Sequence, residues 1–332
     1  MVQAYERRGL SADHALDRAQ IPPPLLQQDG ARVTALQMEW MSEAAMRELD
    51  DEALGCFDRR LPWGSYGMLV RASLSAPNLG VALARWCRHH GLLTEHIGLR
   101  LWREGTTAHL ALSEHRPLHH GGHHWQEFCV VSVLRNALGV AQWLIDSQLR
   151  LQTVQLAFVP PPHASAYAVL FDGPVRFGAD EHRLSFDAGY LDLPIKRDEA
   201  ALQRMLQRAL LLTVRPYRRD RLLRERVRAL LLRGQGALGP AATAADLAEA
   251  LHVSERTLHR QLKDEGASLQ AIKDDVRRQR AQDLLQRSRK PIKHIAAEVG
   301  FGSEKSFIRA FKGWTGQTPD GFRQASFKSS TI

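Results

Sequence analysis

Two similar stretches near the C-terminus decide the fold of this chain. Residues 246–263 read DLAEALHVSERTLHRQLK, and residues 294–312 read HIAAEVGFGSEKSFIRAFK. Each has an apolar residue followed by Ala, and later an apolar-x-Arg-x-apolar pattern centred on Arg260 or Arg309. The first halves match at an offset of 48 positions and the second halves at 49, so the second stretch carries one extra residue in its turn. This duplication predicts two helix-turn-helix units.

Local signals mark the ends of the predicted helices. Ser254 and Ser303 stand where each second helix would begin, and Ser is a favoured N-cap. Thr243 is followed three positions later by Asp246, which indicates a capping box at the start of the first unit.

The turn between the two helices of each unit favours a residue that tolerates positive φ. Gly300 supplies it in the second unit. In the first unit His252 occupies the equivalent position, and His adopts positive φ less readily than Gly but more readily than most residues.

Apolar spacing turns one face of each second helix inward and leaves a polar face outside. Leu258 and Leu262 point inward in the first unit, as do Phe307 and Phe311 in the second. Arg fits the paired acceptors of guanine, while His, Ser and Lys can contact base edges or phosphates. Two such helices suit successive major-groove segments of one DNA face, although a charged helix face is more often simply solvated.

The positive charge lies in the same part of the chain. The net charge of the 332 residues is +9. From residue 215 to the end there are 24 Lys and Arg against 13 Asp and Glu, whereas the preceding part has 21 against 23. This asymmetry indicates a polyanionic partner for the C-terminal part alone.

Cysteine usage and hydropathy indicate a cytoplasmic protein. Cys56, Cys87 and Cys129 lie far apart and form no CxxC pair, which argues against a disulfide framework or a zinc ribbon. The N-terminus has no signal-peptide pattern, and no stretch approaches the ~20 apolar residues that span a bilayer. No nucleophile elbow, phosphate-binding loop or dinucleotide fingerprint is present, so the sequence indicates neither an enzyme nor a cofactor.

The first part of the chain predicts an α+β domain. The spacing of apolar residues favours strands and helices in alternation around a long buried helix. Helices are expected at Ala4–Ala19, Ala35–Leu49, Leu79–His90, His123–Ile145 and Ala164–Phe171, strands at 97–101, 107–112 and Leu151–Val159, and a hairpin or edge pair at Pro174–Phe177 with His182–Phe186.

Helices and a joint connect this domain to the repeated units. Helices are expected at Asp198–Thr213 and Arg219–Leu232, followed by a Gly-rich joint at 234–240. A longer helix at Ser268–Gln286 would hold the two units at the spacing of one duplex turn, about 34 Å.

The C-terminal third resembles the AraC/XylS family of bacterial transcriptional regulators. The resemblance rests on Leu247-Ala248 with 253–263 in the first unit, on Val276-Arg277 and Leu284-Leu285 between the units, and on 292–323, where it is close almost throughout. It implies an all-α DNA-binding domain with helix-turn-helix units at 243–264 and 291–314, within 219–328.

Carried over by position, the resemblance implies which side chains contact DNA. Base-reading positions fall on Arg256, His259, Arg260, Glu304, Lys305, Ser306 and Arg309, and backbone contacts on Thr257, Lys263, Lys312 and Thr318. Glu304 would have to accept from a cytosine amino group or orient Lys305.

Residues 1–195 resemble the arabinose-binding-like regulatory domain of the same family, with 196–218 as a helical linker. The pattern includes Ala76-Pro77, Leu79-Gly80 and Pro174–Phe177. The resemblance implies a domain that senses a small-molecule effector, with homodimerisation and RNA polymerase as further partners and no membrane partner. Several Trp residues, including Trp63, could line a pocket, but most are expected in the core. The effector contacts stay unassigned, with Arg71, Trp86 and Trp125 as the candidates.

A dense histidine cluster offers a different interpretation. His115, His119, His120, His123 and His124 could bind a metal, and the chain would then be a metal-dependent enzyme. No HExxH spacing accompanies them, so a solvated loop is the default and no metal is assigned. A third interpretation is an architectural DNA-binding protein without an effector.

Overall fold

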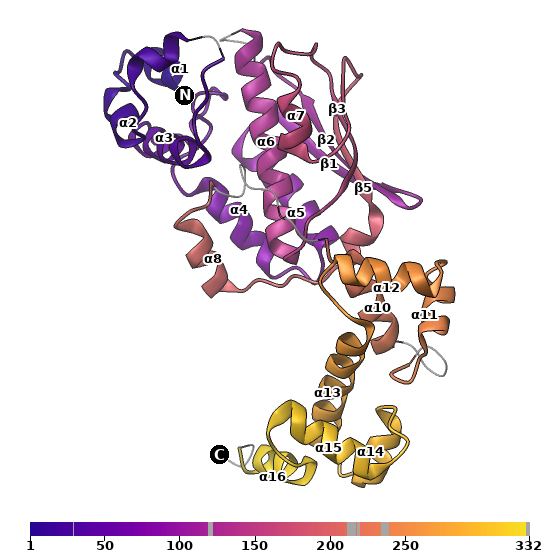
Figure 1. Ribbon diagram of the computed structural model, residues 1–332. Coiled ribbons are helices and arrows are strands. Elements are labelled where there is room, and N and C mark those ends of the chain that lie inside the picture. The colour runs from indigo at the N-terminus through magenta and orange to yellow at the C-terminus, as the bar shows by residue number, and fades with distance from the viewer. Residues whose placement is uncertain (29, 119–121, 211–216, 218–219, 234–238, 330–332) are drawn as a thin grey trace. The chain divides into compact units, whose positions relative to one another are not determined.

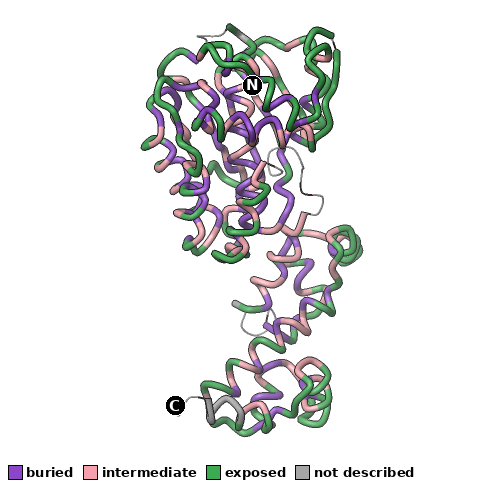
Figure 2. The backbone as a smooth tube through the Cα atoms, turned by 90° about the vertical axis from the view of Figure 1, so that its left-hand side faces the viewer, coloured by how far each residue is buried: buried purple, intermediate pink, exposed green. Residues whose placement is uncertain are grey.

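The computed structural model describes all residues except 29, 119–121, 211–216, 218–219, 234–238 and 330–332. For residues 123, 233 and 325–329 it describes the backbone but not the side chains. The chain divides into two compact units, Met1–Asp220 and Arg221–Ile332 (Figure 1). Buried positions run through the interior of each unit (Figure 2), so each unit has its own core.

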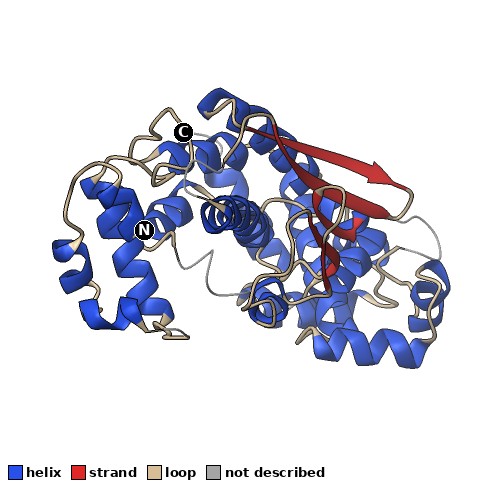
Figure 3. Ribbon diagram, turned by 90° about the horizontal axis from the view of Figure 1, so that it is seen from above, coloured by secondary structure: helices blue, strands red, loops and turns tan. Residues whose placement is uncertain are grey.

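The first unit contains one five-stranded sheet. The strand order is β1-β2-β5-β3-β4, and every neighbouring pair is antiparallel except β3–β4, which is parallel. Figure 3 shows the strands gathered in this sheet among the helices. Its strands are β1 Ile97–Glu104, β2 Thr107–Glu114, β3 Leu151–Leu156, β4 Val175–Phe177 and β5 His182–Asp187.

The expected pairing of 174–177 with 182–186 is wrong, because β3 lies between β4 and β5. β5 pairs with β3, where Leu184 faces Val154 and the register shifts between Leu151 and Thr153, and it pairs with β2 on its other side. Leu184 and Phe186 are almost fully buried. A strand with such apolar residues is more stable in the centre of a sheet than as part of an edge hairpin.

Helices pack against the sheet, and most begin and end where the sequence predicts. Ala35–Leu49 and His123–Ile145 are confirmed as α3 and α6, whereas the single helix expected at Ala4–Ala19 is wrong. The chain breaks into two short helices around Gly9, whose φ is +65°. The helices are α1 Val2–Glu6, α2 Asp13–Arg18, α3 Ala35–Glu48, α4 Ser65–Leu74, α5 Leu79–Leu93, α6 His123–Ile145, α7 Ala166–Phe171 and α8 Glu199–Leu206, with 3-10 turns η1 Pro23–Gln27 and η2 Ala188–Asp192.

The helix expected at Asp198–Thr213 is shorter than the sequence predicts. Its regular part, α8, ends at Leu206, and 207–210 form turns. Residues 211–213 lie outside the described part of the chain.

Helix α6 is long and apolar enough between His124 and Ile145 to cross a membrane. This corrects the expectation that no stretch approaches that length. Most of the helix is buried inside the unit, including Val130, Leu134 and Ala137, and it lies beside α5 (Figure 1). It therefore has the environment of a core helix, and no other helix among the described residues combines this length and composition.

The second unit is all-α, and one helix is shared by its two hydrophobic cores. The first core contains Leu269, Ile272 and Val276 of α13, and the second contains Ala281 and Leu285 of the same helix. Of the expected joint at 234–240, residues 234–238 lie outside the described part. The helices are α10 Leu222–Arg233, α11 Ala244–Ala250, α12 Glu255–Asp264, α13 Leu269–Arg287, α14 Ile292–Glu298, α15 Glu304–Thr315 and α16 Pro319–Ser329.

Both predicted turns adopt the left-handed backbone. The φ of His252 is +56° and that of Gly300 is +83°. A Cβ on Gly300 would also lie 3.2 Å from the backbone of Pro240 and Ala241, which is tighter than ordinary contact. Gly300 is therefore required both for its φ and for this close approach.

We expect Gly300→Ala to lower the free energy of unfolding by about 1–2 kcal/mol or more, because an alanine is strained at this φ and its Cβ crowds the Pro240 backbone. Urea denaturation of the full chain measures the change. Gly302→Ala is the control, since a Cβ there meets nothing within 4 Å. Equal effects of the two substitutions would contradict this role of Gly300.

Candidate nucleic-acid interface

Each helix-turn-helix unit is held by apolar side chains where its two helices meet. α11 contacts α12, and α14 contacts α15. Leu258, Leu262, Phe307 and Phe311 are all fully buried, as the apolar spacing predicts. The outward faces of α12 and α15 are therefore fixed relative to the cores beneath them.

The predicted caps are present at the start of the helices. The Ser254 hydroxyl accepts the Thr257 N–H at 3.1 Å, and the Ser303 hydroxyl accepts the Ser306 N–H at 3.2 Å. Thr243 and Asp246 form a capping box. The Thr243 N–H and hydroxyl both donate to the Asp246 carboxylate, and these bonds lower its pKa.

The two exposed helix faces carry the same pattern of basic residues. Positions i, i+4 and i+7 lie on one face of a helix. They are occupied by basic residues on α12 and, 49 positions later, on α15, and all six are exposed. None of the six forms an ion pair within the described part of the chain. We call them the basic stripes: Arg256, Arg260 and Lys263 on α12, and Lys305, Arg309 and Lys312 on α15.

The other predicted DNA contacts also lie on these helices or beside them. His259 and Glu304 are exposed. Three hydroxyls already have partners inside the protein: Thr257 bonds the Ser254 hydroxyl, Ser306 bonds Ser303, and Thr318 caps α16 by accepting the Gly321 N–H.

Arg277, which enters the sequence resemblance without an assigned role, contacts the surroundings of both helix-turn-helix units. Arg277 on α13 donates from Nε to the carbonyl of Pro240 at 3.2 Å. Its guanidinium lies 5.2 Å from the ring centroid of Phe301. Pro240 lies just before the first helix-turn-helix unit and Phe301 lies in the turn of the second. Arg277 therefore links the second unit to the segment that leads into the first. A half-buried arginine on a helix has no sequence pattern that would predict this role.

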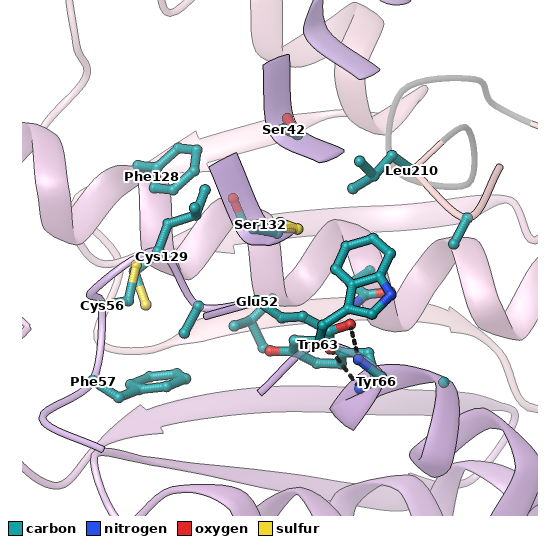
Figure 4. Close-up of a pocket in the computed structure, with 18 of the residues that line it drawn as sticks. Ser42, Glu52, Cys56, Phe57, Trp63, Tyr66, Phe128, Cys129, Ser132 and Leu210 are labelled. Atoms are coloured by element: carbon teal, nitrogen blue, oxygen red, sulfur yellow. Dashed lines mark hydrogen bonds between the residues drawn. The ribbon is translucent and has the colours of Figure 1, made fainter. Parts of the chain in front are cut away.

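The N-terminal compact unit, Met1–Asp220, holds a cavity of about 290 Å³ (Figure 4). Its walls come from α3, the segment 52–67 with Arg71 of α4, α6 and the segment 206–210. Most lining side chains are apolar or aromatic, which is typical of small-molecule sites. They include Met38, Met46, Leu54, Phe57, Trp63, Tyr66, Phe128, Val133, Leu206 and Leu210, with Ser42, Glu52, Cys56, Arg71, Cys129, Ser132 and Asn136 as the polar and thiol groups.

The three predicted effector contacts do not converge on this cavity. Arg71 lines it, and its guanidinium binds Glu199 at 2.8 Å. Trp86 and Trp125 are buried and are not among the lining residues. Trp86 stacks on Tyr66, which does line the cavity, with ring centroids 6.0 Å apart.

The histidine cluster forms no metal site in the part of the chain that the structure describes. His115 bonds the Ser113 hydroxyl at 3.1 Å, and His124 is exposed at the start of α6. His119, His120 and the His123 side chain lie outside the described residues. Elsewhere in the described part, no three His, Cys, Asp or Glu side chains are placed to hold a metal ion.

Two helix-turn-helix units with matching basic stripes, joined to an α+β unit with a cavity, define a DNA-binding regulator with a separate sensing domain. Comparison with known families agrees with this class. The model "Arabinose-binding domain of AraC transcription regulator, N-term" matches residues 9–195, and a helix-turn-helix domain model matches 247–325. The chain belongs to the AraC family of transcription regulators, with an N-terminal effector-binding domain and a C-terminal DNA-binding domain.

Several similar proteins are named as regulators. The ornithine utilization regulator of Pseudomonas aeruginosa is 30% identical over 321 residues, which are 96% of this chain and 92% of the relative. The HTH-type transcriptional regulator VqsM of the same species is 40% identical over 78 residues, 24% of each chain. The crystal structure of the transcriptional regulator CdpR, also from P. aeruginosa, is 24% identical, covers 96% of this chain and 98% of its own, and gives a TM-score of 0.34.

We expect Arg277→Lys to weaken binding to a DNA fragment that the wild-type protein has selected from a random pool. Lysine keeps the charge but cannot make both the hydrogen bond to the Pro240 carbonyl and the stacking contact with Phe301. The two helix-turn-helix units are therefore held less firmly. The loss should be roughly 1 kcal/mol, about fivefold in Kd. Fluorescence anisotropy measures it.

Arg278→Lys is the matched control, because Arg278 is exposed on the same helix and pairs only with Asp275 among the residues described. If both variants bind the selected DNA as tightly as the wild type, Arg277 does not set the arrangement of the units.

Proposed function

We propose that α12 and α15 enter successive major-groove segments of one DNA duplex. The observation that carries this proposal is the repetition of the basic stripe at a constant offset on both helices. The 19 residues of α13 span about 28 Å, close to the length of one duplex turn. A helix of this length suits the separation that the two recognition helices would need.

Within these helices we assign base contacts to Arg256, His259 and Arg260, and to Glu304, Lys305, Ser306 and Arg309. Arginines on the stripes suit guanine, and Glu304 suits a cytosine amino group. Thr257, Lys263, Lys312 and Thr318 are assigned to the phosphate backbone, where Lys acts as a point charge without sequence preference.

The cavity of the first unit is the proposed effector site. Its wall includes Leu206, Ala209 and Leu210, and this segment leads along the chain towards the DNA-binding domain. Arg208 holds the segment through Glu39, with contacts of 3.0 and 2.7 Å, and α8 is held through Arg71 and Glu199. A ligand that contacts this wall would bias the position of the linker.

This proposal keeps the domain limits of the sequence: 1–195 for sensing, 196–218 as linker and 219–328 for DNA binding. The regulator would act in the cytoplasm, with RNA polymerase as a further partner and homodimerisation through the first domain. An enzymatic activity has no support from the described residues or from the relatives.

We expect Arg260→Ala and Arg309→Ala each to cost about 1–3 kcal/mol of binding free energy and to relax base preference at one position. Binding to a selected site and to its single-base variants, by anisotropy at fixed salt, measures both effects. Arg287→Ala removes an exposed charge from α13, outside the stripes, and is the control. A uniform loss on all sequences would assign the arginines to phosphates instead.

We expect Ser132→Phe to abolish the change in target-promoter activity that the wild-type protein produces between growth conditions, because the ring fills the cavity and excludes the effector. A reporter fused to a promoter bound by the protein measures this. Val159→Phe places the same ring on the surface, where Val159 is 77% exposed, and should leave the response intact. An unchanged response in Ser132→Phe would favour an architectural DNA-binding protein without an effector.

A further inference from the structure

The cavity holds a carboxylate that backbone groups satisfy only in part. Glu52 lines the cavity and lies beside Tyr66 and Trp63 (Figure 4). One carboxylate oxygen accepts the Gly64 N–H and the other accepts the Tyr66 N–H, both at 2.7 Å. Each oxygen retains a second acceptor position.

The surroundings of Glu52 are negative rather than positive. Burial raises the pKa of the Glu52 carboxyl, the two N–H groups oppose this, and Asp51 and Asp50 raise it further. Asp51 is itself paired with Arg8 at 2.6 Å. Among the described residues Glu52 has no ion-pair partner, so its charge is compensated by backbone dipoles alone.

The one basic side chain among the described lining residues is already occupied. Arg71 binds the two oxygens of Glu199 at 2.8 and 3.3 Å. An anionic ligand would therefore meet Glu52 without a free cation to balance it. A neutral ligand could donate a hydrogen bond to the carboxylate but would leave its charge unbalanced. Both are unfavourable in a partly closed apolar site.

Aromatic rings in the wall of the cavity favour a positive charge. Phe57, Trp63, Tyr66 and Phe128 line the cavity. The guanidinium of Arg47 lies 4.5 Å from the Trp63 ring centroid, so one face of this ring already carries a positive charge, and a ligand would meet the remaining ring faces. Ring faces attract ammonium groups, most strongly where water is excluded.

We propose that this cavity binds an organic cation, a protonated amine with an apolar body, whose ammonium pairs with Glu52 while its body packs on the aromatic wall. The inference rests on the proposed role of the cavity as the effector site and adds the chemical class of the ligand.

Three probes that share an apolar body and differ in charge test this class: 2-phenylethylamine, 2-phenylethanol and 3-phenylpropanoate. Isothermal titration calorimetry of the full chain near neutral pH should give the tightest binding for the amine, with the alcohol about tenfold weaker or more and the anion weakest. Amine binding should weaken as the pH falls through the raised pKa of Glu52, because the protonated carboxyl no longer pairs with the ammonium.

Glu52→Gln should weaken amine binding about 30-fold or more and leave alcohol binding within about threefold. Asp50→Asn is the matched control, since Asp50 belongs to the same acidic segment and accepts the Trp63 N–H but does not line the cavity. It should keep amine affinity within about threefold. If Glu52→Gln fails to fold, the ranking of the probes on the wild type still decides.

Equal or tighter binding of the alcohol or the anion, or no binding of any probe at millimolar concentration, would overturn the amine class. Ser132→Phe distinguishes a wrong ligand class from a wrong location of the effector site. If it abolishes binding of the preferred neutral or anionic probe, the cavity remains the effector site and only the class is wrong. If binding persists, the cavity is not the site.

Discussion

The sharing of α13 between two hydrophobic cores is the constraint on which the second unit depends. Leu269, Ile272 and Val276 belong to one core, and Ala281 and Leu285 to the other. Because both cores pack on one continuous helix, the length of α13 sets the separation of the two helix-turn-helix units. From the middle of α13, Arg277 contacts Phe301 in the second helix-turn-helix unit and Pro240, just before the first. The matching basic stripes gain their significance from this fixed separation.

The helix-turn-helix units could be predicted from the sequence because their signals are local. Caps, turns and apolar spacing act within a few residues, and each was found where the sequence placed it. His252 illustrates this: its position in the pattern predicted a left-handed residue, and its φ is +56° although it is not glycine. The extra residue between the repeats lies in the second turn, which is longer than the first.

The parts that could not be predicted depend on contacts between distant segments. β5 lies between β2 and β3, and no local pattern indicates its place in the centre of the sheet. The cavity joins α3, the segment 52–67, α6 and the segment 206–210. Composition could not tell Trp63, which lines the cavity, from Trp86 and Trp125, which lie buried elsewhere. Glu52 had no motif that would indicate a role, and its environment became evident only from the fold.

Binding to DNA sites of altered spacing tests the central claim most directly. A selected site would be compared with versions in which about five base pairs, half a helical turn, are inserted between the two contacted segments. If the units are rigidly held by α13, the insertion moves one segment to the opposite face of the duplex. The affinity of the protein for the inserted site should then fall to its affinity for DNA that carries only one of the two segments. Unchanged affinity for the inserted site would contradict the account.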